Sequence, residues 1–339
     1  MLAITGVVFL RILVYWPSAP DGVLRFLVEG LSSYGEVVVA RSHEEALELV
    51  VDADVFVGAA SNDIVGRGSK LRFVQHTFAG VDGLDLSLFR SRGVMLASAK
   101  GVNSFYVAEL ALALILALVK RVTFYDRIVK SDFFPRYTWE YGMGTLRGRK
   151  VVILGYGGIG RELARMLKPF NVKIVGVKRS SKTEDDGVAD EIVSFERLEE
   201  AVEGADVLVV AVPLTKETRG LVNEGVLRRL KRGAIVVNVS RGHVIDESSI
   251  AKLLEEGWIS GAGLDVWWVY PWEPGGGVYS RTGVHRFEGV VATPHRGGFV
   301  EEAFMDIARF AVENVGRFAG GLELFNLVDF DGVIRVLLE

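Results

Sequence analysis

The chain has 339 residues, half of them hydrophobic, so it is long enough for two domains with buried cores. Its formal net charge is only −4, with acidic and basic residues mixed along the chain, which argues against a nucleic-acid or anionic-membrane partner. It contains no cysteine, which excludes disulfides, thiolate metal sites and a cysteine nucleophile.

The first expected element lies in the apolar N-terminal stretch, MLAITGVVFLRILVYW. This stretch lacks the basic region of a signal peptide and Arg11 interrupts it, so we interpret residues 1–10 as an extension before the strand RILVYW. A second apolar run, residues 110–119, is shorter than the about 20 residues that cross a membrane. We expect it to be a buried or subunit-interface helix, and the protein to be soluble and cytoplasmic.

Short β-branched runs alternate with helical segments through the first hundred residues. The runs are RILVYW, EVVVA, DVFVGAA, LRFVQH and VMLAS, and segments such as SHEEALELV separate them. Continuously apolar strands that alternate with helices predict a parallel sheet covered by helices on both faces. We expect this first part to end at residue 101.

A long apolar helix is expected over residues 103–121, followed by the aromatic, irregular stretch SDFFPRYTWEYGMGTLRGR. A second α/β series then runs through KVVILG, VKIVGV, ADVLVVAV, AIVVNVS, ISGAGLDV and GVVATPH. The last helix, residues 301–320, comes after this series is complete and is free to return to the first part. We therefore expect two doubly wound parallel-sheet α/β domains: a discontinuous one of residues 1–101 and 303–339, and one of residues 102–302.

The stretch GYGGIG stands between the strand KVVIL and the helix GRELARMLKPF. Strand, glycine turn, helix and second strand form the context that a dinucleotide-binding fingerprint requires. Gly155 permits the sharp turn, Gly157 lets the backbone approach a pyrophosphate, and Gly160 lets the helix pack against the strand. Gly158 and Ile159 begin the helix, whose free N–H groups face the phosphates. The sequence therefore predicts a Rossmann-type domain.

The next strand, VKIVGV, ends in Lys178 and Arg179, with no acidic residue where one usually binds the ribose hydroxyls of NAD. Lysine and arginine attract a 2′-phosphate, which a carboxylate would repel. We therefore expect NADP(H) to be favoured over NAD(H).

Four later stretches, VPLTKETRGLVN, VVNVSRGHVIDE, GAGLDV and TPHRGG, resemble the D-isomer-specific 2-hydroxyacid dehydrogenase family, which includes glyoxylate/hydroxypyruvate reductases. The resemblance runs from LRFVQHTFAGVDGLDL to TPHRGG, in order and at family-like spacing. It implies a flavodoxin-like substrate domain, a Rossmann-type cofactor domain, an active site in the cleft and a homodimer. The implied reaction moves a hydride between NADP(H) and a 2-oxo acid/D-2-hydroxy acid pair, in the reductive direction.

The resemblance also implies roles for single residues. Arg241 matches the family's substrate arginine, which holds the carboxylate and polarises the ketone. His295 matches the acid/base histidine, a residue type whose ordinary pKa of about 6.5 suits proton transfer near neutrality. Asp265 would face the nicotinamide carboxamide. The other expected substrate- and cofactor-binding residues are Phe78, Ala79, Gly80, Val212, Pro213, Thr218, Val239, Ser240, Tyr270 and Gly297.

The family pattern is broken after Asp265. The family places a glutamate five positions later, followed by proline, where it pairs with the histidine and raises its pKa. Here the stretch reads DVWWVYPWEP, with Tyr270 at that position and Glu273 three residues further. Tyr270 keeps the family's distance in sequence from the end of the strand, which favours it as the partner of His295. A carboxylate would keep His295 protonated as a proton donor, which favours Glu273.

The rival to an enzyme is a non-catalytic dinucleotide-binding sensor resembling a corepressor. The presence of both Arg241 and His295 argues against it. No histidine–carboxylate group in the sequence has metal-ligand spacing, so no metal site is expected.

Overall fold

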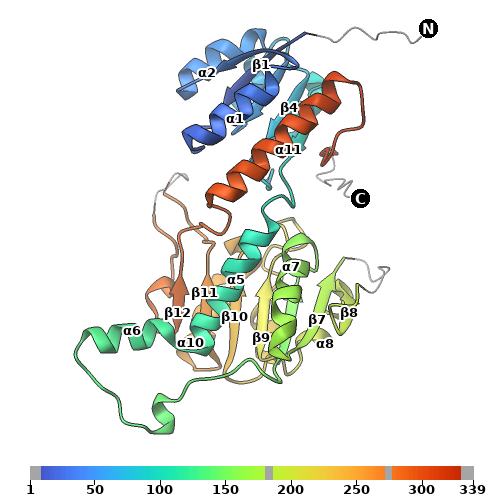
Figure 1. Cartoon of the computed structure of the whole chain (residues 1–339). Helices are drawn as coiled ribbons and strands as arrows, with labels where there is room; N and C mark the ends of the chain where they lie inside the picture. Colours follow the sequence, from blue (N-terminus) through green and yellow to red (C-terminus); the bar gives the residue numbers. More distant parts are fainter. Residues whose placement is uncertain (1–8, 180–185, 272–276, 330–339) are drawn as a thin grey trace. The chain divides into compact units, whose positions relative to one another are not determined.

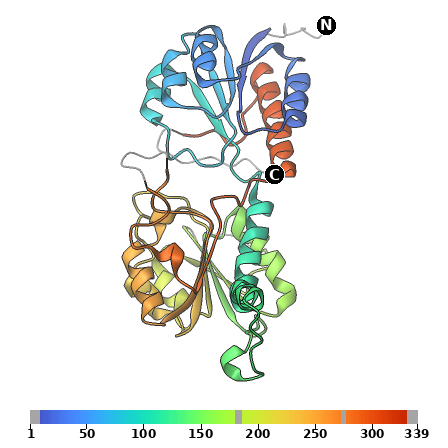
Figure 2. The same cartoon turned by 90° about the vertical axis from the view of Figure 1, so that its left-hand side faces the viewer.

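The computed structural model describes residues 9–179, 186–271 and 277–329. The chain forms two compact units, one of Met1–Asn103 with Phe299–Glu339 and one of Ser104–Gly298 (Figures 1 and 2). Each unit has its own parallel sheet and its own cores on the two faces of that sheet.

The first unit is a five-stranded parallel sheet in the order β2-β1-β3-β4-β5, the flavodoxin-like order. Its strands are β1 (Leu10–Tyr15), β2 (Gly35–Val39), β3 (Val55–Gly58), β4 (Phe73–His76) and β5 (Met95–Ser98). Its helices are α1 (Asp21–Leu31), α2 (His43–Leu49), α3 (Asn62–Arg67), α4 (Leu86–Arg92) and α11 (Glu301–Ala319). Helices α1 and α11 lie side by side on one face although they are far apart in the sequence (Figure 1).

Alternation along β1 explains the two cores of this unit. Ile12 and Val14 belong to the core beneath α1 and α11, whereas Leu13 belongs to the opposite core with α2, α3 and α4. Successive side chains of a strand point to opposite faces, so a strand buried on both faces must be apolar throughout. This is why RILVYW carries no charged residue after Arg11.

The second unit is a seven-stranded parallel sheet in the order β12-β11-β10-β9-β6-β7-β8. Its strands are β6 (Lys150–Leu154), β7 (Lys173–Lys178), β8 (Glu191–Ser194), β9 (Val207–Val210), β10 (Ala234–Asn238), β11 (Ile259–Leu264) and β12 (Val290–Ala292). Its helices are α5 (Ser104–Val119), α6 (Val122–Lys130), α7 (Gly158–Leu167), α8 (Leu198–Val202), α9 (Glu224–Arg229) and α10 (Glu247–Glu255). The strand order reverses between β6 and β9, the switch point at which such sheets bind ligands.

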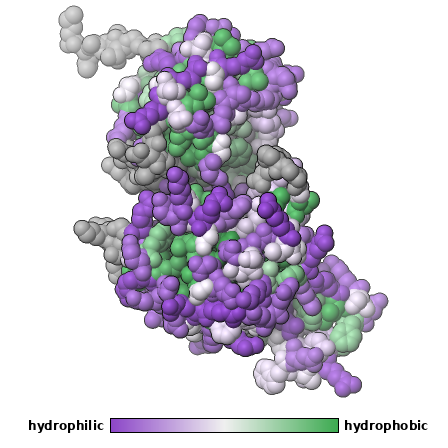
Figure 3. Space-filling model, turned by 180° about the vertical axis from the view of Figure 1, so that it is seen from behind, coloured by the Kyte–Doolittle hydropathy of each residue, from purple (hydrophilic) through white to green (hydrophobic). Residues whose placement is uncertain are grey.

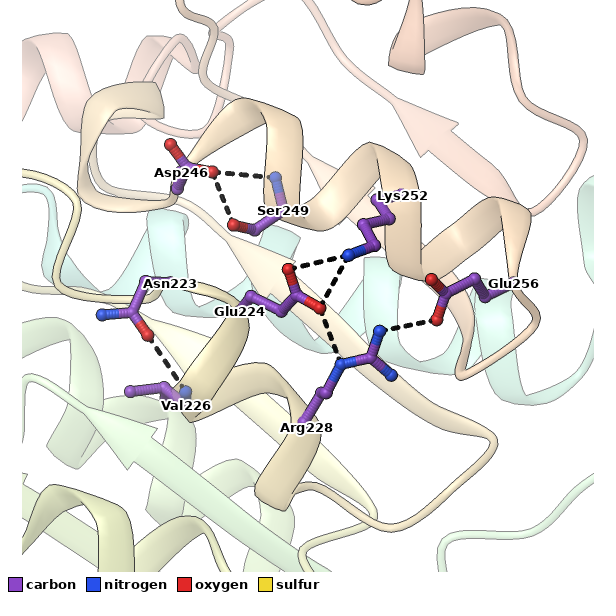
Figure 4. A network of polar contacts seen from close by, with 8 residues as sticks. All are labelled: Asn223, Glu224, Val226, Arg228, Asp246, Ser249, Lys252 and Glu256. Atoms are coloured by element: carbon purple, nitrogen blue, oxygen red, sulfur yellow. Dashed lines mark hydrogen bonds and ion pairs between the residues drawn. The ribbon is translucent and has the colours of Figure 1, made fainter.

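Helices cover both faces of this sheet. Helices α5 and α7 pack side by side on one face, and α8, α9 and α10 contribute to the core on the other (Figure 1). A polar contact connects α9 to α10: Glu224 accepts from Lys252 at 3.0 Å, and Glu224 also accepts from Arg228 of its own helix at 2.7 Å (Figure 4). Both helices begin at capping residues, Asn223 and Asp246, whose side chains accept backbone N–H groups of the first turn.

The two doubly wound parallel-sheet units predicted from the sequence are confirmed. The helix expected over residues 103–121 ends earlier, because Arg121 adopts a left-handed conformation (φ 52°) and the chain continues as the unpredicted helix α6. Strand β8, a short edge strand, was also not predicted. Within the described ranges, none of the helices has the length and apolar character needed to span a bilayer.

Candidate active site at the strand ends of the second unit

Three neighbouring strands of the second unit bring the candidate catalytic residues to one edge of its sheet. Strands β10, β11 and β12 pair in parallel, so their carboxyl ends meet at the same edge. Arg241 follows β10, Asp265 follows β11 and His295 follows β12. Backbone hydrogen bonds continue the pairing just past the strands, from Asp265 N to Asn238 O at 3.1 Å.

The loop that carries Arg241 is built around a buried amide. Asn238 Oδ1 accepts from the N–H and the hydroxyl of Ser240, at 3.0 and 2.9 Å, and Asn238 Nδ2 donates to Arg241 O at 3.0 Å. The next residue must be a glycine, because a Cβ on Gly242 would lie 2.2 Å from Trp267 O. Arg241 Nη1 donates to Ser240 O at 2.8 Å. The half-buried guanidinium therefore stands on a rigid loop.

Asp265 organises the loop that carries His295. Its carboxylate is 2% exposed and accepts from Thr293 Oγ1 at 2.6 Å, from Arg296 N at 2.8 Å and from Gly297 N at 3.0 Å. These three bonds fix the backbone on both sides of His295. Asp265 is therefore a positioning residue for that histidine, whatever contact it makes with a cofactor.

His295 has a constrained backbone and a defined neighbour. Its φ is +58°, a left-handed conformation that costs a non-glycine residue energy and persists only where the surroundings hold it. Tyr270 Oη lies 2.9 Å from His295 Nδ1, and Trp267 N donates to the same phenol oxygen at 3.2 Å. Trp267 Nε1 also donates to Thr293 O at 3.0 Å. Glu273, the other candidate partner, lies outside the described residues.

The glycine turn fits a dinucleotide. Gly155 has φ +107°, and a Cβ there would lie 2.5 Å from Ala211 C; a Cβ on Gly160 would lie 2.3 Å from Gly155 O. Packing therefore demands both glycines. In contrast, a Cβ on Gly157 would meet nothing within 4 Å, and Gly157 is the N-cap residue before α7, where no side chain caps the helix. The exposed N–H groups of Gly157 and Gly158 thus border open space, as a bound pyrophosphate requires.

The loop after β9 lies across the switch point from Gly155. Val212 and Thr218 are buried, and Thr218 Oγ1 donates to Pro213 O at 2.7 Å while it accepts from Thr215 N at 2.8 Å. The hydroxyl of Thr218 therefore holds this loop in shape. Among the other predicted cofactor residues, Val239 and Ser240 are buried and Ile159 is half-buried.

Sequence reasoning missed one carboxylate near the end of β7. Lys178 is half-buried and Arg179 exposed, as expected for a basic strand end. Asp186, eight residues beyond Lys178, accepts from Tyr156 Oη at 3.0 Å and from Val188 N at 3.1 Å. Burial opposes its charge, but these hydrogen bonds hold the pKa of Asp186 below its ordinary value. The fingerprint spacing does not point to this residue, because it comes after the strand and a loop.

The remaining predicted substrate residues lie on the first unit. Phe78, Ala79 and Gly80 follow β4; Phe78 is half exposed, and its carbonyl accepts from Ala99 N at 3.1 Å. The strand ends in His76, a buried residue whose Nδ1 accepts from Ala60 N at 3.2 Å. This loop therefore starts from a fixed strand end and leaves an aromatic side chain accessible.

Comparison with known proteins identifies the family. The family model described as "D-isomer specific 2-hydroxyacid dehydrogenase, NAD binding domain" matches residues 112–297, more than half of the chain. The chain belongs to the D-isomer specific 2-hydroxyacid dehydrogenase family. The resemblance inferred from the sequence is thereby confirmed, and the protein is an oxidoreductase with a Rossmann-type NAD(P)-binding domain.

Relatives of this dehydrogenase match along most of its length. The glyoxylate reductase of Thermococcus litoralis is 33% identical over 84% of this chain and 86% of its own length. The glyoxylate reductase of Aeropyrum pernix is 33% identical over 91% of this chain and 94% of its own length. The solved structure of a family member from Aeromonas salmonicida is 27% identical, with a TM-score of 0.82, and covers 95% of this chain and 99% of its own. A structure from Thermus thermophilus is 30% identical, with a TM-score of 0.77, and covers 94% of this chain and 100% of its own.

Asp265 provides a first test of this dehydrogenase site. Replacing Asp265 with Asn removes a carboxylate that accepts three hydrogen bonds from the His295 loop, so kcat should fall about a hundredfold as the histidine loses its position. Steady-state kinetics with a 2-oxo acid would measure this. Asp206→Asn is the matched control, because Asp206 is also a buried acceptor for a backbone N–H, that of Lys150. It should cost stability and spare kcat; equal losses of kcat in both variants would contradict the positioning role.

His76 makes the stability of the dehydrogenase depend on pH. Burial lowers the pKa of His76 to about 4, so the folded protein keeps this ring neutral while the unfolded chain protonates it below about pH 6.5. The unfolded state then binds more protons between pH 6.5 and 4. The contribution is fully present above pH 6.5, and about 3 kcal/mol is lost as the pH falls to 4. Urea unfolding across this window should show a shallower pH dependence for His76→Asn, and parallel curves would contradict the assignment.

Proposed function

We propose that this dehydrogenase reduces glyoxylate, or a similarly small 2-oxo acid, with NADPH. The observation that carries the proposal is the position of Arg241 and His295 on loops at the same edge of the sheet, after the two strands that flank β11. Arg241 supplies a cation and His295 a proton carrier. The glyoxylate reductases of Thermococcus litoralis and Aeropyrum pernix, which align over more than four fifths of the chain, support glyoxylate as the first substrate to test.

Arg241 is proposed to bind the substrate. A 2-oxo acid presents a carboxylate beside a carbonyl group, which is an aldehyde in glyoxylate and a ketone in the larger acids. A guanidinium forms charge-assisted hydrogen bonds with such a carboxylate. The same cation stabilises the negative charge that develops on the ketone oxygen during reduction. Because Asn238 fixes the loop, little reorganisation is needed when this charge develops. Backbone N–H groups of Phe78, Ala79 and Gly80 are proposed to donate to the same carboxylate.

His295 is proposed to supply the proton. A nicotinamide cofactor, when bound, supplies the hydride that adds to the ketone carbon. As the carbon–oxygen π bond breaks, its electron pair takes the proton of the imidazolium, which leaves a hydroxyl group and a neutral His295. Tyr270 faces Nδ1, so we assign the transfer to Nε2. Solvent then restores the proton, and the 2-hydroxy acid leaves; with glyoxylate this product is glycolate, and a larger 2-oxo acid would give the D isomer.

The cofactor is proposed to be NADP(H). The turn of Gly155, Gly157 and Gly160 would receive the pyrophosphate, and the basic pair Lys178 and Arg179 would face the 2′-phosphate. The further residues proposed to line the nicotinamide and ribose positions are Gly158, Ile159, Val212, Pro213, Thr218, Val239, Ser240, Asp265, His295 and Gly297. The absence of cysteine fits the cytoplasm, where we propose the reaction takes place.

A coupled absorbance assay tests the proposal. Purified protein is given NADPH or NADH with glyoxylate, hydroxypyruvate, pyruvate or phenylpyruvate, and loss of the reduced cofactor is followed. We expect turnover with at least one acid, fastest with glyoxylate and with NADPH. A preference for NADH would contradict the proposed binding of the 2′-phosphate by Lys178 and Arg179, but the protein would still be a 2-oxo acid reductase. Tight cofactor binding without turnover of any acid would favour the sensor.

We propose that the protein is a homodimer held by the arm, defined as residues 122–143. Tyr137 and Trp139 are 99% and 96% exposed, and Phe133, Phe134 and Met143 are also exposed (the arm lies at the lower right in Figure 3). Exposed apolar side chains gathered in this way mark an interaction surface. A groove runs beside the arm, lined in part by Leu118, Phe124 and Val291, and the arm of a second copy is its proposed occupant.

The dimer is tested by light scattering after gel filtration. We expect twice the chain mass of 37.2 kDa for the natural protein. Replacing Tyr137 and Trp139 together by Ser should give the monomer mass without changing the circular dichroism spectrum, because neither ring is packed in the unit. A monomeric natural protein would contradict the proposal.

A further inference from the structure

Arg161 follows the glycine turn directly and has no role in the function proposed so far. It is in the first turn of α7, immediately after Gly160, and 40% of its side chain is exposed. Lys178 ends the neighbouring strand β7, and Val177 O accepts from Gly155 N at 2.9 Å and from Tyr156 N at 3.0 Å. The end of β7 is therefore bonded to the same turn that leads into Arg161.

The Nε of Arg161 lacks an acceptor among the residues that the structure describes. This atom is buried, and it forms no hydrogen bond within the described ranges. The carboxylate oxygen Oδ2 of Asp186 lies 3.8 Å away, within ion-pair range but too far for a hydrogen bond. The carboxylate of Asp186 accepts from Tyr156 Oη at 3.0 Å and from Val188 N at 3.1 Å. Asp186 therefore balances part of the charge of Arg161 without satisfying its N–H.

Two cationic side chains, Arg161 and Lys178, lie near the glycine turn and the end of β7. Lys178 has a lowered pKa because it is partly buried and because Arg161 repels its charge, while Asp186 acts in the opposite direction. Holding two positive charges near one already bonded carboxylate is unfavourable. An additional anion near both side chains would offset the repulsion, and the Arg161 side chain, 40% exposed, is accessible to one.

We propose that Arg161, together with Lys178, determines the specificity of the cofactor site for the 2′-phosphate of NADP(H). The proposal rests on the NADP(H) preference proposed above and adds a residue that lies on α7, outside the basic strand end. The mechanism is recognition of the phosphate by charge. Arg161 has no part in the chemical step.

Calorimetry with fragments of the cofactor tests Arg161 without turnover. Adenosine 2′,5′-bisphosphate and AMP differ only in the 2′-phosphate. The natural protein should bind the bisphosphate more tightly. Arg161→Gln should weaken bisphosphate binding by about tenfold, the usual effect of losing one charge-assisted contact, and leave AMP binding within about twofold. In steady-state kinetics, KM for NADPH should rise about tenfold, while kcat and the KM for NADH should remain unchanged.

Arg165→Gln is the matched control. Arg165 lies one turn further along α7, pairs with Glu162 and is half exposed, so its replacement should change neither affinity. Equal weakening of both fragments by Arg161→Gln, or no weakening of either, would overturn the role in specificity. If the natural protein binds both fragments alike, the NADP(H) preference fails along with this inference, whereas reduction of glyoxylate by NADH would show that the reductase itself stands.

Discussion

Replacing Arg241 with Gln should lower kcat/KM for glyoxylate reduction about a thousandfold. The change removes a guanidinium that is proposed to bind the substrate carboxylate and to stabilise the developing oxyanion. A single hydrogen-bond donor to such an oxyanion lowers the activation free energy by about 3–4 kcal/mol. Steady-state kinetics with NADPH would measure the loss. Cofactor affinity, followed by fluorescence, should stay within about twofold, because Arg241 is proposed to touch only substrate.

The structure offers controls for the Arg241 prediction. Arg241→Lys keeps the charge but loses the planar pair of donors, so it should recover only part of the activity. Arg228→Gln removes a guanidinium that pairs with Glu224 and Glu256 on the surface (Figure 4), and it should leave kcat/KM unchanged. An Arg241→Gln variant that keeps most of its activity would show that the substrate carboxylate is bound elsewhere.

The sequence predicted the two sheets because their strands are buried on both faces. The runs VVIL and AIVV are apolar throughout, as a strand covered by helices on both sides requires. The short edge strand β8 was not predicted because it contains only two apolar residues, which are flanked by Glu191 and Ser194. Helix α6 was not predicted: it follows α5 directly after the left-handed residue Arg121, and none of its residues is fully buried in a core.

The partners of the candidate site residues were harder to predict. Motif spacing located Arg241, Asp265 and His295. It did not reveal that the Asp265 carboxylate accepts from the Thr293 hydroxyl before His295 and from two backbone N–H groups after it. Nor did it point to Asp186, which reaches Tyr156 from beyond a loop. Such contacts depend on which loops from different strands lie close together in the folded chain, and local sequence patterns do not predict this.

Replacing His295 with Gln should lower kcat for reduction about a thousandfold, because glutamine cannot donate the proton that the ketone oxygen needs. NADPH affinity should be kept. The natural enzyme should lose activity as the pH rises, since only the protonated imidazole donates, and this alkaline decline should be absent from the residual activity of the variant. His43→Gln is the control, because His43 lies on the first unit, paired with Asp63, and should change neither kcat nor the pH profile.

The alkaline decline also separates the two candidate partners of His295. A carboxylate beside the ring favours its protonated form, so Glu273→Gln would move the decline to lower pH if Glu273 were the partner. The 2.9 Å contact instead leads us to expect that Glu273→Gln leaves the decline in place. Tyr270→Phe should lower kcat about tenfold, since the ring loses the hydrogen bond that orients it. The phenol of Tyr270 adds no charge beside His295. We therefore expect Arg241 to supply the electrostatic stabilisation in catalysis and Tyr270 only to orient the His295 ring.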